Sequence, residues 1–194
     1  LWLAALPKPG LPKPGVATLR DRLSSVRPGA DLALPVRPAE GVIAGLPGAV
    51  TDLAVSQDGR SLLVAHYGDD AVSIVDTATN TVSATIETGL FTFPSWVVAS
   101  PDSAHVYVAL GAGLSEIDTA TNTVTGSVNL GSDQPTGVAI DPAGTAVYVS
   151  TYQTAEGTSP GGRVIVIDTA SLAIVATIEL GINFVPGGVA VSPY

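Results

Sequence analysis

Four polar residues within a stretch of five form the densest group of side chains that could do chemistry in this sequence. His66 and Tyr67 are followed, after one glycine, by Asp69 and Asp70. An imidazole beside two carboxylates is a set of ligands that metal cations accept. A solvated loop after a strand explains the same residues more simply, because polar residues are typical of connections between strands. We therefore expect these residues to belong to a binding loop and not to a metal site.

The other residues give little support for nucleophilic catalysis. The 194 residues include no cysteine, which excludes thiolate nucleophiles, thiolate metal sites and disulfides. Only two histidines are present, and no spacing of Ser, His and Asp indicates a triad. His105 follows a turn and begins a strand, so we expect an exposed edge residue. Residues 157–162, GTSPGG, lack the lysine and the following helix of a phosphate-binding loop. We expect no catalytic residue, cofactor or metal.

Charge is distributed unevenly along the chain. Eight Lys and Arg stand against 17 Asp and Glu, for a net charge of -9, and most of the basic residues lie in the first 40 positions. After residue 40 the basic residues are Arg60 and Arg163, while the acidic residues number fourteen. Such a surface neutralises few phosphates, so we expect no nucleic acid as a partner.

Composition favours short strands over helices. The chain contains 21 Gly and 15 Pro, and it is 46% hydrophobic but only 13% charged. Many turns and few charges are typical of an all-β fold. No apolar stretch reaches the 18 or so residues of a membrane-spanning helix, so we expect no transmembrane segment.

Three repeated segments follow residue 50. The run IDTATNTV of the second recurs nearly verbatim in the first and as IDTASLAI in the third, and Asp76, Asp118 and Asp168 mark the same position at intervals of 42 and 50 residues. The second interval is longer because residues 154–162 form an insertion. Each repeat contains four apolar or alternating runs, in the first LAVS, SLLVAH, AVSIVD and TVSATIE, separated by turns such as SQDG at 56–59. Four short antiparallel strands per 40 to 45 residues predict the blade of a β-propeller.

The predicted architecture is therefore an all-β, incomplete β-propeller of four-stranded antiparallel blades, about three full blades plus partial ones, after a Pro-rich N-terminal extension. We expect a Pro/Gly-rich linker with a short helix at 1–30 and repeats at 31–194. Within the repeats we expect a partial blade at 31–49, full blades at 50–93, 94–134 and 135–185, and the start of another at 186–194. An open set of blades leaves apolar faces in water. Truncation of a larger ring is the preferred explanation, and the rivals are a ring of two chains and a four-bladed closure.

The repeats resemble a known family. The pattern VAxSPDGxxVYV followed by VIDTATNTVxATIxxG is similar to the YVTN-type β-propeller repeat of surface-layer and other exported bacterial and archaeal proteins. The strand that names the motif is matched by Val106–Leu110, by Val147–Thr151 and more weakly by Leu62–His66. The resemblance covers about residues 41–194 and not the first 40. It implies an exported protein, periplasmic, secreted or on the cell surface, whose complete ring has about seven blades.

Connections in such blades alternate between the two ends of each sheet. The SQDG and DTATN turns share one end, where we expect Asp76, Asp118 and Asp168 to bond to their own turns. The irregular connections share the other end, and binding surfaces are typically grafted onto such loops. The candidates there are His66, Tyr67, Asp69, Asp70 and Tyr152. Phe93 and Trp96 flank a link between blades, where we expect burial.

These observations favour a non-enzymatic binding or scaffold module with an unknown protein or surface ligand as partner and with self-association through exposed blade faces. The alternative is part of a lactonase-like, quinoprotein-like or haem d1-like propeller whose active residues lie in missing blades. Such sites need clustered His, Glu, Arg or metal ligands, which this sequence lacks.

Overall fold

The computed structural model describes residues 43–90, 92–153 and 161–192, and in these residues it contains strands and no helix. All of these residues belong to one compact unit, Gly41–Tyr194. The linker and short helix predicted at 1–30 lie outside the described residues. So do most of the partial blade predicted at 31–49 and most of the insertion at 154–162.

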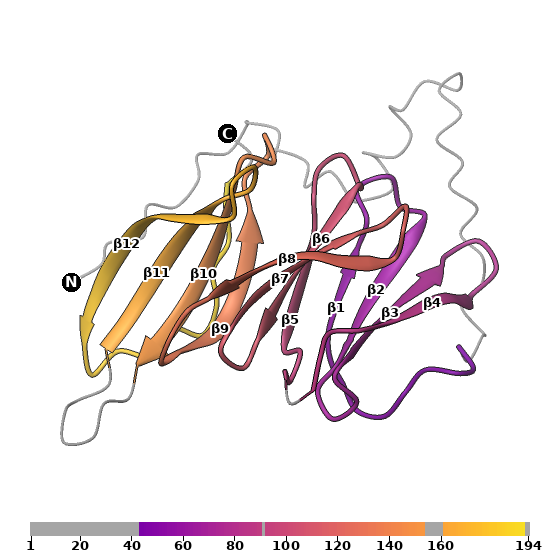
Figure 1. The fold of residues 1–194 in the computed structure, drawn as a ribbon, viewed down its shortest axis with the longest axis horizontal. Coiled ribbons are helices and arrows are strands. Elements are labelled where there is room, and N and C mark those ends of the chain that lie inside the picture. Colours follow the sequence, from indigo (N-terminus) through magenta and orange to yellow (C-terminus); the bar gives the residue numbers. More distant parts are fainter. Residues whose placement is uncertain (1–42, 91, 154–160, 193–194) are drawn as a thin grey trace, which may run out of the picture. The chain divides into compact units, whose positions relative to one another are not determined.

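Twelve strands form three antiparallel sheets that lie side by side in Figure 1. The first sheet contains β1 (Val50–Val55), β2 (Ser61–His66), β3 (Ala71–Asp76) and β4 (Thr81–Glu87). The second contains β5 (Trp96–Ala99), β6 (His105–Leu110), β7 (Gly113–Asp118) and β8 (Thr123–Asn129). The third contains β9 (Asp133–Ile140), β10 (Ala146–Gln153), β11 (Gly161–Asp168) and β12 (Ala173–Ile182). In each sheet the spatial order follows the chain, which confirms the predicted all-β, incomplete propeller.

The sheets meet through aliphatic side chains. Along β6, Val106 and Val108 pack against the first sheet, while Tyr107 and Ala109 pack against the third. Because neighbouring residues of a strand point to opposite faces, a strand covered on both faces is apolar throughout. This explains the continuous runs HVYVAL and SLLVAH. Trp96 packs against the cluster between the second and third sheets, as expected.

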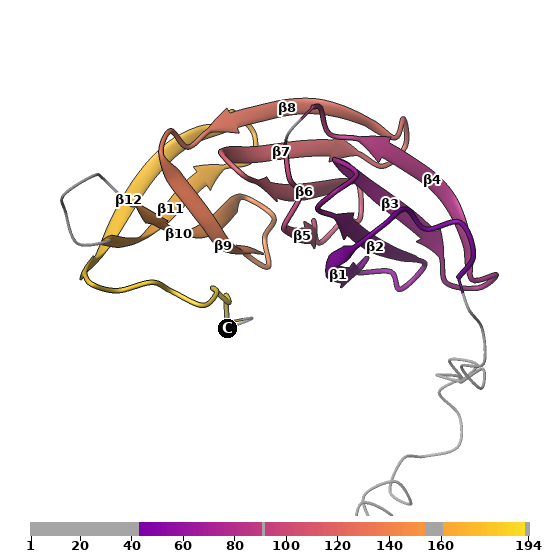
Figure 2. The ribbon, with the colours of Figure 1, turned by 90° about the horizontal axis from the view of Figure 1, so that it is seen from below.

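The strands of each sheet differ in exposure. β2, β3 and β6 are almost wholly buried, whereas all ten residues of β12 are exposed. Figure 2 shows the fourth strands, β4, β8 and β12, along one margin and the first strands, β1, β5 and β9, along the opposite one. The most buried strands therefore lie in the middle of their sheets.

The segment after β12 lies where a further first strand would begin. Residues 186–192 form no strand, but a methyl group added to Gly137 of β9 would lie 2.8 Å from Cα of Gly188 and 3.1 Å from the nitrogen of Val189. The segment thus runs beside β9. At the other end, residues 43–49 form no strand.

The short turns share one end of the sheets, as predicted. Thr77, after β3, donates from its backbone nitrogen to the carbonyl of Arg60 at 3.0 Å and from Oγ1 to that of Gly59 at 2.7 Å. Within its own turn, Oδ1 of Asp76 accepts hydrogen bonds from the backbone nitrogens of Ala78 and Thr79, each at 2.8 Å. These bonds lower the pKa of Asp76, and equivalent ones lower those of Asp118 and Asp168. The expected structural role of the three aspartates is confirmed.

Replacing Val108 with Asp tests this packing. Val108 is completely buried between the first and second sheets, and an unpaired carboxylate there should lower the free energy of unfolding by more than about 4 kcal/mol. Val124 of β8 is partly exposed, so Val124→Asp should cost only about 1 kcal/mol. Urea titration of both variants measures the difference. Similar losses in the two variants would contradict the assigned register.

Candidate functional site

The two ends of the sheets carry different connections. The turn end carries the β1–β2 and β3–β4 turns and their equivalents. The loop end carries the β2–β3 connection at 67–70 and the links between sheets. There, Thr88 donates to the carbonyl of Asp70, and the nitrogen of Gly111 donates to the carbonyl of Thr92. The loop end therefore joins neighbouring blades as well as strands of one blade.

His66 is not part of the solvated loop that the sequence predicted. It is the last residue of β2 and is fully buried. Its Nε2 lies 3.0 Å from Oγ of Ser73, which in turn lies 3.3 Å from Oγ1 of Thr85. β2 continues for one residue beyond its apolar run. His66 therefore belongs to the strand, and its ring is buried beside Ser73 of β3. Among residues 43–90, 92–153 and 161–192, no three His, Asp or Glu side chains are placed to hold a metal ion.

Asp70 anchors the link between the first and second sheets. Its backbone adopts a left-handed φ of 49°. Oδ1 accepts hydrogen bonds from the backbone nitrogens of Thr92 and Phe93, each at 2.9 Å. Asp70 therefore positions the aromatic residue of the link, and this is a structural contact that supports any site built around Phe93. Asp69, one residue earlier, is exposed.

Tyr67 and Phe93 form the aromatic wall of a pocket at the loop end. Their rings stack with centroids 5.0 Å apart and an angle of 29° between planes. The pocket has a volume of about 440 Å³ and is also lined by Leu110, Gln134 and Pro135. The structure thus brings the predicted Tyr67 together with Phe93, which was expected to be buried between blades. The signal in the sequence that could have indicated this pocket was an aromatic residue, Phe93, directly before Pro94 in the link between blades.

Tyr152 does not join this pocket. It lies half-buried in β10, opposite Gln134 of β9, and of these two only Gln134 lines the pocket.

A polar network lies in the third sheet next to Gln134. The buried Asp133 accepts a hydrogen bond from Oγ1 of Thr151 at 3.2 Å and pairs with Arg163 at 3.2 Å. Arg163 also pairs with Glu179 of β12 at 3.0 Å. Sequence reasoning missed this network because its members come from four different strands.

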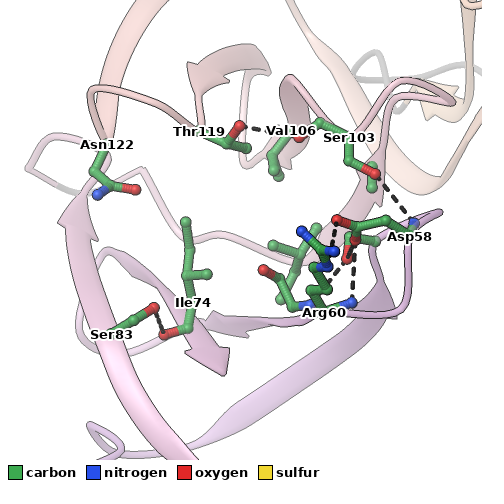
Figure 3. A pocket seen from close by; sticks show the side chains of 12 residues that line it. Asp58, Arg60, Ile74, Ser83, Ser103, Val106, Thr119 and Asn122 are labelled. Carbon is green, nitrogen blue, oxygen red and sulfur yellow. Dashed lines mark hydrogen bonds and ion pairs between the residues drawn. The ribbon is translucent and has the colours of Figure 1, made fainter. Parts of the chain in front are cut away.

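Two equivalent grooves lie between sheets at the turn end. The first, of about 300 Å³, separates the first and second sheets and is drawn in Figure 3. Leu63 and Ile74 form its apolar floor, and Arg60 and Asp58, 3.9 Å apart, lie beside it. The second, of about 320 Å³, separates the second and third sheets. Its floor is polar instead.

Tyr107, Glu116 and His105 form the polar side of the second groove. The hydroxyl of Tyr107 donates to Oε1 of Glu116 at 3.0 Å, and Nδ1 of His105 lies 3.7 Å from the same oxygen. Burial and then this hydrogen bond raise the pKa of Tyr107, so the phenol remains a donor and does not act as a base. His105 is therefore not an edge residue: β6 is the second strand of its sheet, and the ring lines a groove.

Comparison with known proteins supports the fold. No protein-family model matches the sequence, and no curated protein matches it. Among solved structures the chain is similar to hydrazine synthase from Kuenenia stuttgartiensis, a protein that contains a β-propeller. The TM-score is 0.64 and the identity 26%, over 73% of this chain and 40% of that chain. In all, 854 solved chains match, so the likeness identifies a widely shared propeller-like architecture and not one activity.

None of the described segments forms a helix long and apolar enough to cross a membrane.

The burial of His66 predicts a loss of stability in mild acid. Burial lowers the pKa of the ring below 6.5, and the charge of Asp69 only partly opposes this. As the pH falls through about 6.5, the unfolded chain binds a proton that the folded chain does not. The free energy of unfolding should therefore fall by up to about 1.4 kcal/mol per pH unit between pH 6.5 and 5.

The variant His66→Gln is the matched control, because Gln still bonds to Ser73 but does not titrate. Urea unfolding of both chains between pH 7 and 5 measures the effect, above the range in which the turn aspartates titrate. Parallel pH profiles for the two chains would show that the buried imidazole is not responsible.

Proposed function

We propose that this chain is a non-enzymatic binding or scaffold module of an exported or cell-surface YVTN-like β-propeller protein, and that it is a fragment of a larger ring. The proposal is supported by the family resemblance of the repeats, by the pocket at the loop end and by the face of the third sheet that points away from the second, the free face, which no sheet of the described residues covers. The observation that carries it is the exposure of one residue of β12.

Ile86, Val128 and Ile178 occupy the same place in the three repeats, one residue before the end of the runs ATIE, GSVN and ATIE. Ile86 is 5% exposed and Val128 is 8% exposed, because each packs against the cluster between its own sheet and the next. Ile178 is 50% exposed. Tyr148 and Val164 of the third sheet, both half-buried, likewise occupy positions where the second sheet has the buried Tyr107 and Leu114. The free face therefore continues an established interface, and a further blade fits it.

The character of the loop-end pocket supports binding. Stacked aromatic rings with apolar neighbours suit the recognition of a ligand. Asp70, the carboxylate behind them, is engaged with the backbone of the link. We propose Tyr67 and Phe93 as the contact residues, with Asp69 at the rim, for an unknown protein or surface ligand. The acidic repeats argue against nucleic acid.

The second candidate is a propeller enzyme or redox-associated propeller whose active residues lie in blades outside these 194 residues. The likeness to hydrazine synthase favours it, but this chain spans only 40% of that chain. Sequencing the gene upstream and downstream of the region that encodes these 194 residues distinguishes the two candidate functions. An export signal with further plain repeats supports the module, and blades with clustered His, Glu, Arg or metal ligands support the enzyme.

The free face predicts self-association of this chain. Light scattering over a concentration series should show a mass that rises above 19.4 kDa, and added salt should strengthen the association, because it screens the repulsion between chains of charge -9. Ile178→Lys should restore the monomer, since a buried lysine is costly.

Val124→Lys is the control, because Val124 is partly exposed on the fourth strand of the second sheet. It should leave the association unchanged. A wild-type chain that stays monomeric at every concentration, or equal effects of the two lysines, would contradict an interface on the third sheet.

A further inference from the structure

One residue pair distinguishes the second repeat from the other two. Each sheet has a directly paired position on its second and third strands, close to the turn end, on the face that meets the next sheet in the first two sheets. It holds Leu63 and Ile74 in the first sheet, Tyr107 and Glu116 in the second, and Tyr148 and Val166 in the third. The third-strand residue of this pair is aliphatic in the first and third sheets. Packing at this position therefore does not require the carboxylate of Glu116 in the second sheet.

Glu116 is almost buried and has no permanent cation beside it. Its side chain is 13% exposed. Oε1 accepts the hydrogen bond from Tyr107, and Oε2 accepts one from Oγ1 of Thr125 at 2.9 Å. Both donors are neutral, and His105 lies at 3.7 Å. Burying a carboxylate is costly unless it is paired with an opposite charge.

The cations of the described residues are engaged elsewhere. Arg60 pairs with Asp58 beside the first groove, and Arg163 pairs with Asp133 and Glu179 in the third sheet. In the second repeat, Ala104 takes the place that Arg60 has in the first, two residues after the aspartate of the turn. The first groove thus has a guanidinium and an apolar floor. The second has a carboxylate in its floor and no Lys or Arg.

The second groove has room for a ligand of a few carbon atoms. Its volume is about 320 Å³. Asp102 lines it together with Glu116, and Gly144 and Thr169 of the third sheet form the opposite wall. Nδ1 of His105 is buried without a hydrogen bond. A group that carries a positive charge and N–H donors complements this lining.

We propose that the groove between the second and third sheets binds an ammonium or guanidinium group through Glu116. The cation pairs with the Glu116 carboxylate, Tyr107 holds that carboxylate in place, and Asp102 adds negative potential at the groove. The group belongs either to a small free amine or to a lysine or arginine side chain of a partner. This site is separate from the loop-end pocket and from the free face of the third sheet, so it does not rest on the proposed function.

Titration calorimetry of the full chain with n-butylammonium and with neutral n-butanol tests the charge requirement. We expect n-butylammonium to bind, n-butanol not to bind, and added salt to weaken the binding. Glu116→Gln should lower the affinity at least about tenfold, because the charge-assisted bond is lost. Glu87→Gln removes the same charge from an exposed position of β4 and should leave the affinity unchanged. Equal binding of both probes, or an unchanged affinity of Glu116→Gln, overturns the proposal.

A double variant separates binding from folding. Tyr107→Leu with Glu116→Ile places the aliphatic pair of the first repeat in the second. We expect this variant to melt at the wild-type temperature or above it and to lose the binding of n-butylammonium. A markedly lower melting temperature would assign Glu116 to the fold and overturn the proposal.

The source of the cation follows from a comparison of probes. A peptide with blocked ends and one central lysine presents the same ammonium group on a side chain. Tighter binding of this peptide than of n-butylammonium supports a partner protein, and weaker binding supports a free amine. Absence of binding by both cations overturns the proposal.

Discussion

Burial of aliphatic side chains between neighbouring sheets is the interaction on which the rest of the structure depends. A four-stranded blade has two apolar faces, and packing against a neighbouring blade removes a face from water. The central strands β2 and β6 are therefore apolar on both sides, and polar residues concentrate in the fourth strands and in the connections. The same requirement explains why the third sheet, with a neighbour on one side among the described residues, exposes every residue of β12.

The fold could be predicted because its determinants are local and repeated. The turn after the third strand, DTATN in two repeats and DTASL in the third, its aspartate and the apolar runs recur along the chain, so one register explains all three sheets. The candidate site was less predictable. His66 begins a run of polar residues in the sequence, yet it is buried at the end of β2, and Glu116 of β7 contacts residues of the two neighbouring strands, β6 and β8. Such placements depend on which faces meet in three dimensions, and a single repeat does not encode them.

Differences between equivalent positions carry the functional information in a repeated fold. Residues that recur, such as Asp76 and Asp118, serve the turns. A residue that breaks the pattern is not required by the common architecture, and Glu116, where the other two sheets have Ile74 and Val166, is such a residue. The loop end varies in the same way, with an aromatic stack in one link and an aspartate paired with arginine after the next. Both ends of the blades therefore offer distinct chemistry on one scaffold.

Hydrogen exchange of backbone amides tests most directly whether cover by neighbouring sheets determines the stability of each blade. β8 and β12 are both fourth strands that pair with one strand of their own sheet, but only the second sheet is covered on both faces. In the monomeric chain at low concentration, the account predicts that the paired amides of β12 exchange much faster than those of β8. Equal protection of the two strands would contradict it.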